Sequence, residues 1–122
     1  MKLNVNQKDL QEALSYCQGV IEKRSTLQIL SNVLLDASNS KLTITATDLD
    51  LIFIHKINNV EIIEDGKTTT TSSIMYDIVR KFSSGKKINL TLNDESKLHL
   101  ESEKSIFNLN CISASEFPLT DE

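Results

Sequence analysis

Glycine and proline are scarce in this chain, which has 3 glycines and 1 proline among 122 residues. Hydrophobic residues make up 39% of the chain and charged residues 25%, as in ordinary globular proteins. Together these values exclude collagen-like, low-complexity and strongly disordered chains. A chain of this length has room for one domain with a true hydrophobic core, and two domains are not expected.

An excess of positive charge is also missing. The 13 Lys and Arg residues are outnumbered by 17 Asp and Glu residues, which gives a net charge of −4 and a pI near 5.2. Domains that wrap nucleic acid through bulk electrostatic attraction are usually basic. The composition therefore argues against that class, although a local basic face remains open.

Cysteines and long apolar runs are few. Cys17 lies in a helical pattern and Cys111 in a strand pattern, each on the apolar side, which predicts buried free thiols in a reduced compartment. The N-terminal stretch has no apolar run long enough for a signal peptide or a membrane span. We therefore expect a cytoplasmic protein without a membrane partner.

The first part of the chain predicts a short strand over 1–5 and a helix over 7–22. Asn6 stands at the N-cap position, three residues before Asp9, in an arrangement similar to a capping box. Apolar residues recur at three-and-four spacing along one stripe. They are Leu10, Ala13, Leu14, Cys17, Val20 and Ile21. The opposite face is polar but weakly charged, and consists of Lys8, Gln11, Ser15, Gln18 and Glu22.

The rest of the chain alternates in the manner of strands and repeats one order of elements. Three strands are predicted within 27–57, followed by a loop over 61–67. A strand over 68–72, a helix capped near Ser72 or Ser73, and three strands within 87–112 follow. We predict an α+β domain with a duplicated strand-helix-three-strand unit, in which two helices lie on one side of eight short strands.

Few residues favour catalysis. His55 and His99 each alternate with apolar neighbours in a strand, which favours strand surface or satisfied core over a metal or proton-shuttle role. Neither zinc spacing of cysteines nor a glycine-rich phosphate loop is present. Asp48 and Asp50 have a spacing that some metal-dependent enzymes use, but a tight corner capped by the Asp48 side chain explains them better. No cofactor is expected.

Basic residues follow the ends of both predicted helices. Lys23 and Arg24 follow the first helix, and Arg80 and Lys81 close the second, with Lys86 and Lys87 just beyond. The helix macrodipole favours cations at such ends, which explains part of this pattern locally. If the two halves are related by pseudo-symmetry, the helix-bearing surface would meet phosphates although the chain as a whole is acidic.

The sequence resembles the N-terminal domain of the bacterial DNA sliding clamp family, the beta subunit of the replicative DNA polymerase. The resemblance runs essentially from end to end. The segments that carry it are "KRSTLQILSNVLL", "LTITATDLDL", "MYDIVRKF" and "FNLNCISASEFPLTDE". It implies a non-catalytic processivity factor in which two three-domain subunits join head to tail around duplex DNA. The helices would line the hole, and the strands would form the outside.

The resemblance also implies a DNA-facing surface. Arg24 matches the family position that reaches DNA, and Lys8, Gln11, Gln18, Lys23, Arg80 and Lys81 are the further DNA-binding residues that we predict. A sliding ring should hold phosphates weakly, so a mildly polar lining with few cations suits it. Ser73 and Ile74 depart from the pattern, because family members can carry Arg and Lys there.

A subunit interface is implied on the last strand. The family joins subunits partly through a Phe and a Leu that correspond to Phe107 and Leu109, flanked by basic residues. Lys104 fits this pattern, whereas Ile74 and Ile106 are apolar at positions where cations occur in the family. We therefore predict an interface of Ile74, Lys104, Ile106, Phe107 and Leu109 that depends little on salt.

The chain ends at Glu122, where the second domain of the family would begin, so it is expected to be one N-terminal clamp domain of residues 1–122. The polymerase and the clamp loader would then bind through domains that this chain lacks. Two other interpretations stay open: a stand-alone protein-protein adaptor of the same fold, and a metal-dependent hydrolase that uses Asp48 and Asp50.

Overall fold

The computed structural model describes residues 1–21, 28–93 and 96–118, and Lys23 and Arg24 lie outside these ranges. Two helices are present, α1 (Gln7–Gln18) and α2 (Ser72–Val79), with short 3-10 turns at Gln28–Ser31 and Ala114–Glu116. The strands are β1 (Lys2–Asn6), β2 (Asn32–Ser38), β3 (Lys41–Thr47), β4 (Ile52–Ile57), β5 (Val60–Glu64), β6 (Gly66–Thr71), β7 (Lys87–Leu92), β8 (Lys97–Ser102) and β9 (Ser105–Ile112). The predicted α+β class is confirmed.

The described residues form nine strands, whereas eight were predicted. The extra strand is β5, in the segment that was predicted to be a loop. It pairs antiparallel with β1, so that Leu3 lies opposite Ile62 and Val5 opposite Val60. In the sequence, the adjacent Ile62 and Ile63 and the acidic residues around them obscure the alternation of apolar and polar residues that is typical of a strand. β5 covers an edge of β1 that would otherwise be open.

The duplication is visible in the order of the strands, β4-β3-β2-β6-β9-β8-β7-β1-β5. Each half of the chain contains a strand, a helix and three strands, and β5 lies between the two halves in the sequence. The first strand of each half pairs with the other half, because β6 pairs with β2 and β1 pairs with β7. The two halves therefore exchange their first strands, and neither half has a complete sheet of its own.

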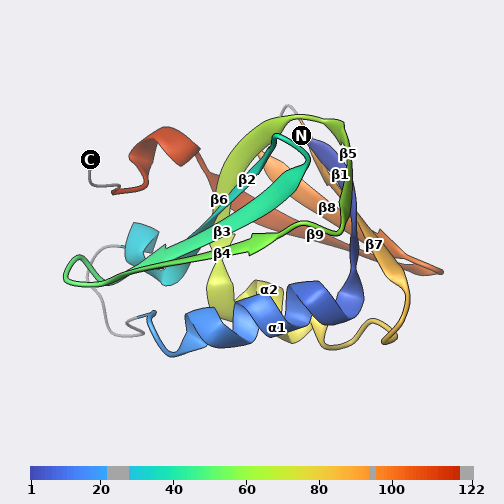
Figure 1. The fold of residues 1–122 in the computed structure, drawn as a ribbon, viewed down its shortest axis with the longest axis horizontal. Coiled ribbons are helices and arrows are strands. Elements are labelled where there is room, and N and C mark those ends of the chain that lie inside the picture. Colours follow the sequence, from blue (N-terminus) through green and yellow to red (C-terminus); the bar gives the residue numbers. More distant parts are fainter. Residues whose placement is uncertain (22–27, 94–95, 119–122) are drawn as a thin grey trace.

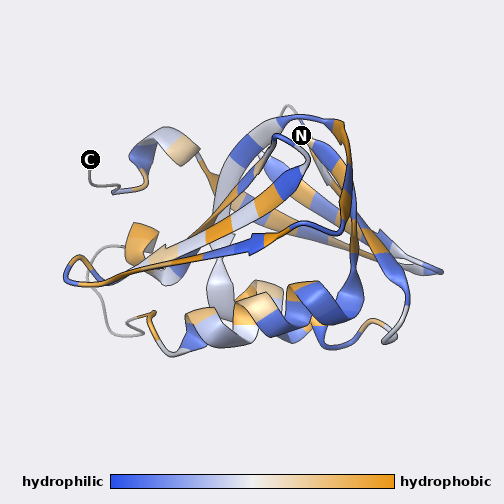
Figure 2. Ribbon diagram, in the orientation of Figure 1, coloured by the Kyte–Doolittle hydropathy of each residue, from blue (hydrophilic) through white to orange (hydrophobic). Residues whose placement is uncertain are grey.

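The sheet curls around the helices (Figure 1). Its two outermost strands, β4 and β5, are joined by Asn58 and Asn59 alone. Three steps between consecutive Cα atoms span at most about 11 Å, so the two ends of the sheet approach each other at this corner. Both helices lie side by side on the concave side of the sheet. Figure 2 shows hydrophobic and hydrophilic residues alternating along the strands, as expected for a sheet with one buried face.

The helix termini differ in part from the sequence prediction. Asn6 caps α1 as predicted, since its Oδ1 accepts a hydrogen bond from the Lys8 backbone N–H at 2.9 Å. The helix ends at Gln18, before the predicted end, because Gly19 forms the C-cap and Val20 continues in a turn. The N-cap of α2 is Thr71, which makes no capping bond through its side chain, and Ser72 is the first helical residue.

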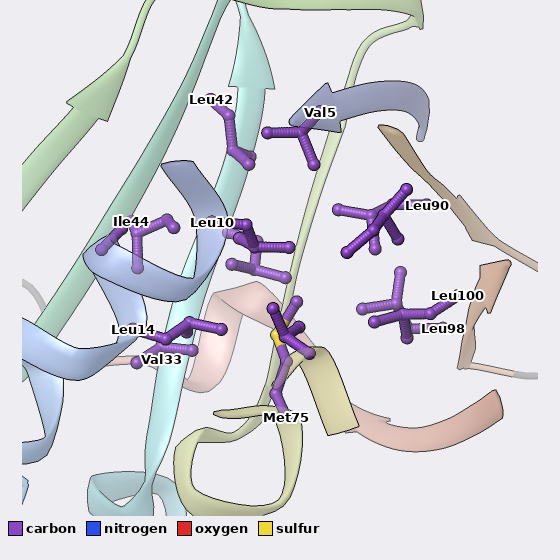
Figure 3. Close-up of a cluster of buried hydrophobic side chains, with 14 of the residues drawn as sticks. Val5, Leu10, Leu14, Val33, Leu42, Ile44, Met75, Leu90, Leu98 and Leu100 are labelled. Atoms are coloured by element: carbon purple, nitrogen blue, oxygen red, sulfur yellow. The ribbon is translucent and has the colours of Figure 1, made fainter. Parts of the chain in front are cut away.

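Side chains from both helices and the concave face of the sheet form one hydrophobic core (Figure 3). Leu10 and Leu14 of α1 meet Met75 of α2 and strand residues such as Ile44 and Leu100, and all five are fully buried. Fully burying such side chains stabilises the fold by about 1.5–3 kcal/mol each. The helices therefore pack on the sheet through one apolar stripe each, and their outer faces stay available.

Both cysteines are free, as predicted. Cys17 is buried in the core, and burial raises the pKa of its thiol to about 12. Cys111 is half-buried, and its pKa is raised mainly by burial, while hydrogen bonds to Thr68 and Thr70 act in the opposite direction. Both thiols are therefore held in the protonated, weakly nucleophilic form.

Cys17 should make stability depend on pH in the alkaline range. Its pKa is higher in the folded chain than in the unfolded chain, where a thiol titrates near about 8.5. Its contribution is therefore complete below that pH and is lost as the pH rises toward the folded value, because the unfolded chain releases the proton first. In urea denaturation between about pH 8 and pH 11, the free energy of unfolding should fall more steeply in the wild type than in Cys17→Ala, by up to about 1.4 kcal/mol per pH unit. Parallel pH profiles would contradict this account.

Gly66 allows a close approach of two chain segments at the start of β6. A Cβ atom at this position would lie 2.7 Å from the Cβ and 2.9 Å from the Cα of Met1. We expect Gly66→Ala to lower the free energy of unfolding by about 1–3 kcal/mol, since the backbone of Met1 would have to move. Gly19→Ala is the matched control. Its Cβ would come no closer than 3.6 Å to the Tyr16 carbonyl, so chemical denaturation should show a change below about 1 kcal/mol.

Candidate nucleic-acid interface

The two helices run antiparallel and are tied together at both ends. At one end, the Gln7 side chain at the start of α1 donates from Nε2 to the Val79 carbonyl at the end of α2, at 2.9 Å. At the other end, the Ser72 hydroxyl of α2 donates to Oε1 of Gln18 at 2.9 Å. This bond explains why Ser72 does not cap its own helix. These two hydrogen bonds therefore fix the spacing of the helices, and the two helices form one continuous outer face.

The outer face is mildly polar. A shallow depression between the helices is lined by Gln7, Lys8, Gln11, Glu12, Ser15, Tyr76 and Ser84. Lys8 and Glu12 are exposed, while Gln11 is half-buried and accepts a hydrogen bond from Gln7 at 2.8 Å. Gln11 and Gln18, both predicted to face DNA, are thus engaged within the helix pair, although each keeps part of its surface exposed.

Cations gather at one end of this face. The start of α1 lies beside the end of α2, so Lys8 and Arg80 belong to the same end, and the Gln7 backbone N–H donates to the Lys86 carbonyl at 2.9 Å. All three cationic side chains are exposed. The Arg80 guanidinium lies over the Tyr76 ring, with its carbon 5.2 Å from the ring centroid. We call Lys8, Arg80 and Lys86 the basic end.

Lys81 faces a different neighbourhood. Together with Lys104 and Glu103 it lines a depression of about 460 Å³ beside the turn between β8 and β9. Lys81 and Lys8, which the sequence prediction grouped as DNA-binding residues, thus line different depressions. At the opposite end of the helix pair, a small depression is lined by Gln18, Ile21, Ser31, Thr71 and Ser73, none of which is charged.

The predicted subunit interface lies along the edge of β9. This strand pairs with β6 only where Thr69 and Thr70 face Ile112 and Cys111, so the pairing with β6 does not extend to the rest of β9. A groove of about 370 Å³ lies here, lined by Asn32, Thr70, Thr71, Ile74, Asn108, Leu109, Asn110, Cys111 and Ile112. An open strand edge next to a groove is the kind of surface that accepts another strand.

Of the five predicted interface residues, Ile106, Phe107 and Leu109 lie on β9, Ile74 lies on α2 and Lys104 lies in the turn between β8 and β9. Leu109 is buried, and the half-buried Phe107 contacts the Phe82 ring edge-on, with centroids 5.6 Å apart. Ile106 is 53% exposed and points to the opposite face, because successive strand residues alternate. Ile74 lines the groove together with Leu109 and is 50% exposed. The two isoleucines are thus the exposed apolar members of the set.

Asp48 builds a corner between β3 and β4. Its Oδ1 accepts hydrogen bonds from the backbone N–H groups of Asp50 at 3.0 Å and Leu51 at 2.7 Å. Leu49, between Asp48 and Asp50, has a φ of 82°. The hydrogen bonds around it can hold this left-handed backbone conformation in place. The Asp48 carboxylate therefore serves the turn, as predicted.

The histidines also have structural surroundings. The ring of His55 stacks on Phe53 and meets Tyr16 edge-on, and Nδ1 of His99 lies 2.9 Å from Oδ1 of Asn108. Within the described ranges, no three His, Cys, Asp or Glu side chains are placed to hold a metal ion. Among the helices described, none is long and apolar enough to cross a membrane.

One family matches almost the whole chain. The sequence profile described as "DNA polymerase III beta subunit, N-terminal domain" covers residues 1–121. The chain belongs to this family. The beta sliding clamp of Caulobacter vibrioides (strain NA1000 / CB15N) is 37% identical over 120 residues, which are 98% of this chain and 32% of that protein. That of Escherichia coli K12 is 33% identical over 122 residues, covering 100% of this chain and 33% of that protein.

Solved structures of the beta subunit family have the same fold. A Caulobacter crescentus pol III beta structure has a TM-score of 0.93 at 36% identity, and the match covers 99% of this chain and 32% of the other. The DNA polymerase III subunit beta of Pseudomonas aeruginosa has a TM-score of 0.94 at 28% identity, with 100% and 33% covered. The chain thus spans about a third of these relatives. They are named as clamps or polymerase subunits, and nothing supports the hydrolase alternative.

Sequence reasoning missed the structural role of the glutamines. Gln7, Gln11 and Gln18 are spaced by four and seven residues, so they lie on one line along α1, next to the apolar stripe. A row of amides beside a buried stripe is the signal that could have predicted contacts to a second helix. The polar face was instead assigned entirely to DNA.

Proposed function

We propose that this chain is the N-terminal domain of a DNA sliding clamp that encircles duplex DNA and tethers the replicative polymerase without catalysis of its own. The observation that carries this proposal is the gathering of Lys8, Arg80 and Lys86 at one end of a mildly polar helix pair in an acidic chain. A few cations can hold phosphates briefly, whereas the net charge of −4 prevents tight, indiscriminate binding. Both properties suit a ring that must slide.

In this function the helix pair faces the DNA, and the basic end meets the phosphate backbone. Lys23 and Arg24, which follow α1 in the sequence, are proposed to add phosphate contacts. Gln11 and Gln18 contribute the remaining exposed parts of their amides, and Lys81 lines the separate depression beside the turn between β8 and β9. The polymerase and the clamp loader would bind parts of the full-length protein that this chain does not span.

The edge of β9 is proposed to join a second subunit head to tail. The open strand edge offers a partner strand backbone hydrogen bonds, and Ile74 and Leu109 offer apolar surface in a groove of mixed polar and apolar lining. Lys104 and Phe107 lie beside this edge, and Ile106 extends it on the outer face. Because Ile74 and Ile106 are uncharged, this contact should rely on apolar burial more than on ion pairs.

Charge reversal at the basic end should weaken DNA binding. We expect Lys8→Glu and Arg80→Glu, and likewise Arg24→Glu, each to reduce the affinity for a short labelled duplex several-fold at low salt and to flatten its dependence on salt. Fluorescence anisotropy across a salt series measures both quantities. Lys41→Glu makes the same charge change at the exposed start of β3, away from the helices, and is the control. Equal losses in all variants, or none, would favour the adaptor interpretation.

An apolar interface can be tested in the full-length protein that carries this domain. Dissociation of the ring, followed by sedimentation velocity, should change little as the salt concentration is raised. Ile74→Glu should promote dissociation by at least about tenfold, since it places a charge in an apolar contact. Ile63→Glu introduces the same charge at a residue of similar exposure, 55%, on the distant β5. A ring that dissociates steeply with salt would refute the apolar contact.

A further inference from the structure

Gln7 is an unusual residue for the start of a helix because its long polar side chain is 2% exposed. Its Nε2 donates two hydrogen bonds, to the Val79 carbonyl at 2.9 Å and to Oε1 of Gln11 at 2.8 Å. Its backbone N–H donates a third bond, to the Lys86 carbonyl at 2.9 Å. The Val79 carbonyl belongs to the last residue of α2 and also accepts a hydrogen bond from the Phe82 backbone N–H at 3.2 Å. One residue therefore ties α1 to two later segments of the chain.

Each cation of the basic end is adjacent to one of these bonds. Lys8 follows Gln7 directly, Arg80 follows Val79, and Lys86 itself supplies the third acceptor. The three cations come from the start of α1, the end of α2 and the loop before β7. They are distant in sequence, so their relative placement depends on contacts between these segments. Gln7 makes such a contact to each of the two segments that α1 must meet.

We propose that Gln7 is the positioning residue of the basic end, which holds the backbones of Lys8, Arg80 and Lys86 in one arrangement so that their side chains meet neighbouring phosphates of a DNA strand. This inference rests on the proposed function. Gln7 does not touch DNA in this account, and its amide is buried beneath the face that does. Gln7 acts by raising the number of phosphates that the three cations of the basic end neutralise at the same time.

The chain contains a matched control at the other end of the helix pair. The buried Ser72 hydroxyl of α2 bonds to Gln18 of α1, but the described residues around this bond carry no cation. Removing the Gln7 amide or the Ser72 hydroxyl loosens one end of the helix pair. Only removal of the Gln7 amide should change DNA binding, if positioning rather than general stability is its role.

The experiment compares Gln7→Met with Ser72→Ala. Methionine keeps the length of the glutamine side chain and removes its donor, and alanine removes the hydroxyl that donates to Gln18. Binding of a labelled duplex is measured over a salt series at a temperature where circular dichroism shows both variants folded. Amide hydrogen exchange at residue 7 and at the end of α2 reports the local bonds without DNA. For Gln7→Met we expect faster exchange, several-fold weaker binding and a salt slope smaller by about 0.9, the value for one phosphate contact. Ser72→Ala should keep the parent slope.

Faster exchange in Gln7→Met with the parent affinity and slope would overturn the inference, since the bond would then be structural only. The same slope loss in Ser72→Ala would overturn it as well. Lys8→Ala, Arg80→Ala and Lys86→Ala separate this failure from that of the proposed function. If all three keep the parent slope, the basic end does not meet DNA and the proposed function fails at this surface. If Gln7→Met does not fold, Gln7→Ser gives the same comparison, because its shorter side chain leaves room for water at the Val79 carbonyl.

Discussion

The arrangement of this domain depends on burying two amphipathic helices side by side against one curved sheet. Leu10 and Leu14 of α1 and Met75 of α2 are buried in the core. Their burial determines which faces of the helices point outward. The boundary between the helices still contains polar atoms. Gln7 and Gln18 satisfy them by bonding to α2, which matters because an unpaired buried polar group destabilises a fold by about 1–3 kcal/mol.

The antiparallel direction of the helices controls the electrostatics. Lys8 at the start of one helix and Arg80 at the end of the other are 72 residues apart, yet they share an end. An acidic protein can in this way form a local cationic surface without a basic composition. Asp77 and Glu12 remain exposed on the same helices and limit its strength. The result is a surface suited to transient rather than tight contact with phosphates.

Much of the local structure could be predicted because it is encoded by neighbouring residues. Asn6 caps its helix, the three-and-four stripe of α1 is buried, and Asp48 closes its corner. The prediction that failed concerns a segment whose structure depends on a partner distant in sequence. β5 is a strand because β1 offers it an edge, although Ile62 and Ile63 break the alternation.

The candidate site was predicted in kind but not in detail. A weakly charged helix face with cations at helix ends is present, but the row of glutamines pointed equally to DNA and to a second helix. Only the position of α2 decides between these roles. Ile106 and Phe107 were grouped by their resemblance to a family pattern, whereas strand alternation places them on opposite faces. Lys23 and Arg24 remain sequence-based proposals.

The exchange of β1 and β6 between the halves has a consequence for how such a domain could have arisen. In a polypeptide equal to one half, β1 would lose its pairing with β7, or β6 its pairing with β2, which leaves β1 paired only with β5 and β6 only with two residues of β9. Two copies could restore the lost pairings by swapping those strands, as in a domain-swapped dimer. An ancestor of half this length would thus have gained strand pairings by dimerising, and gene duplication would have converted an association between chains into a fold within one chain.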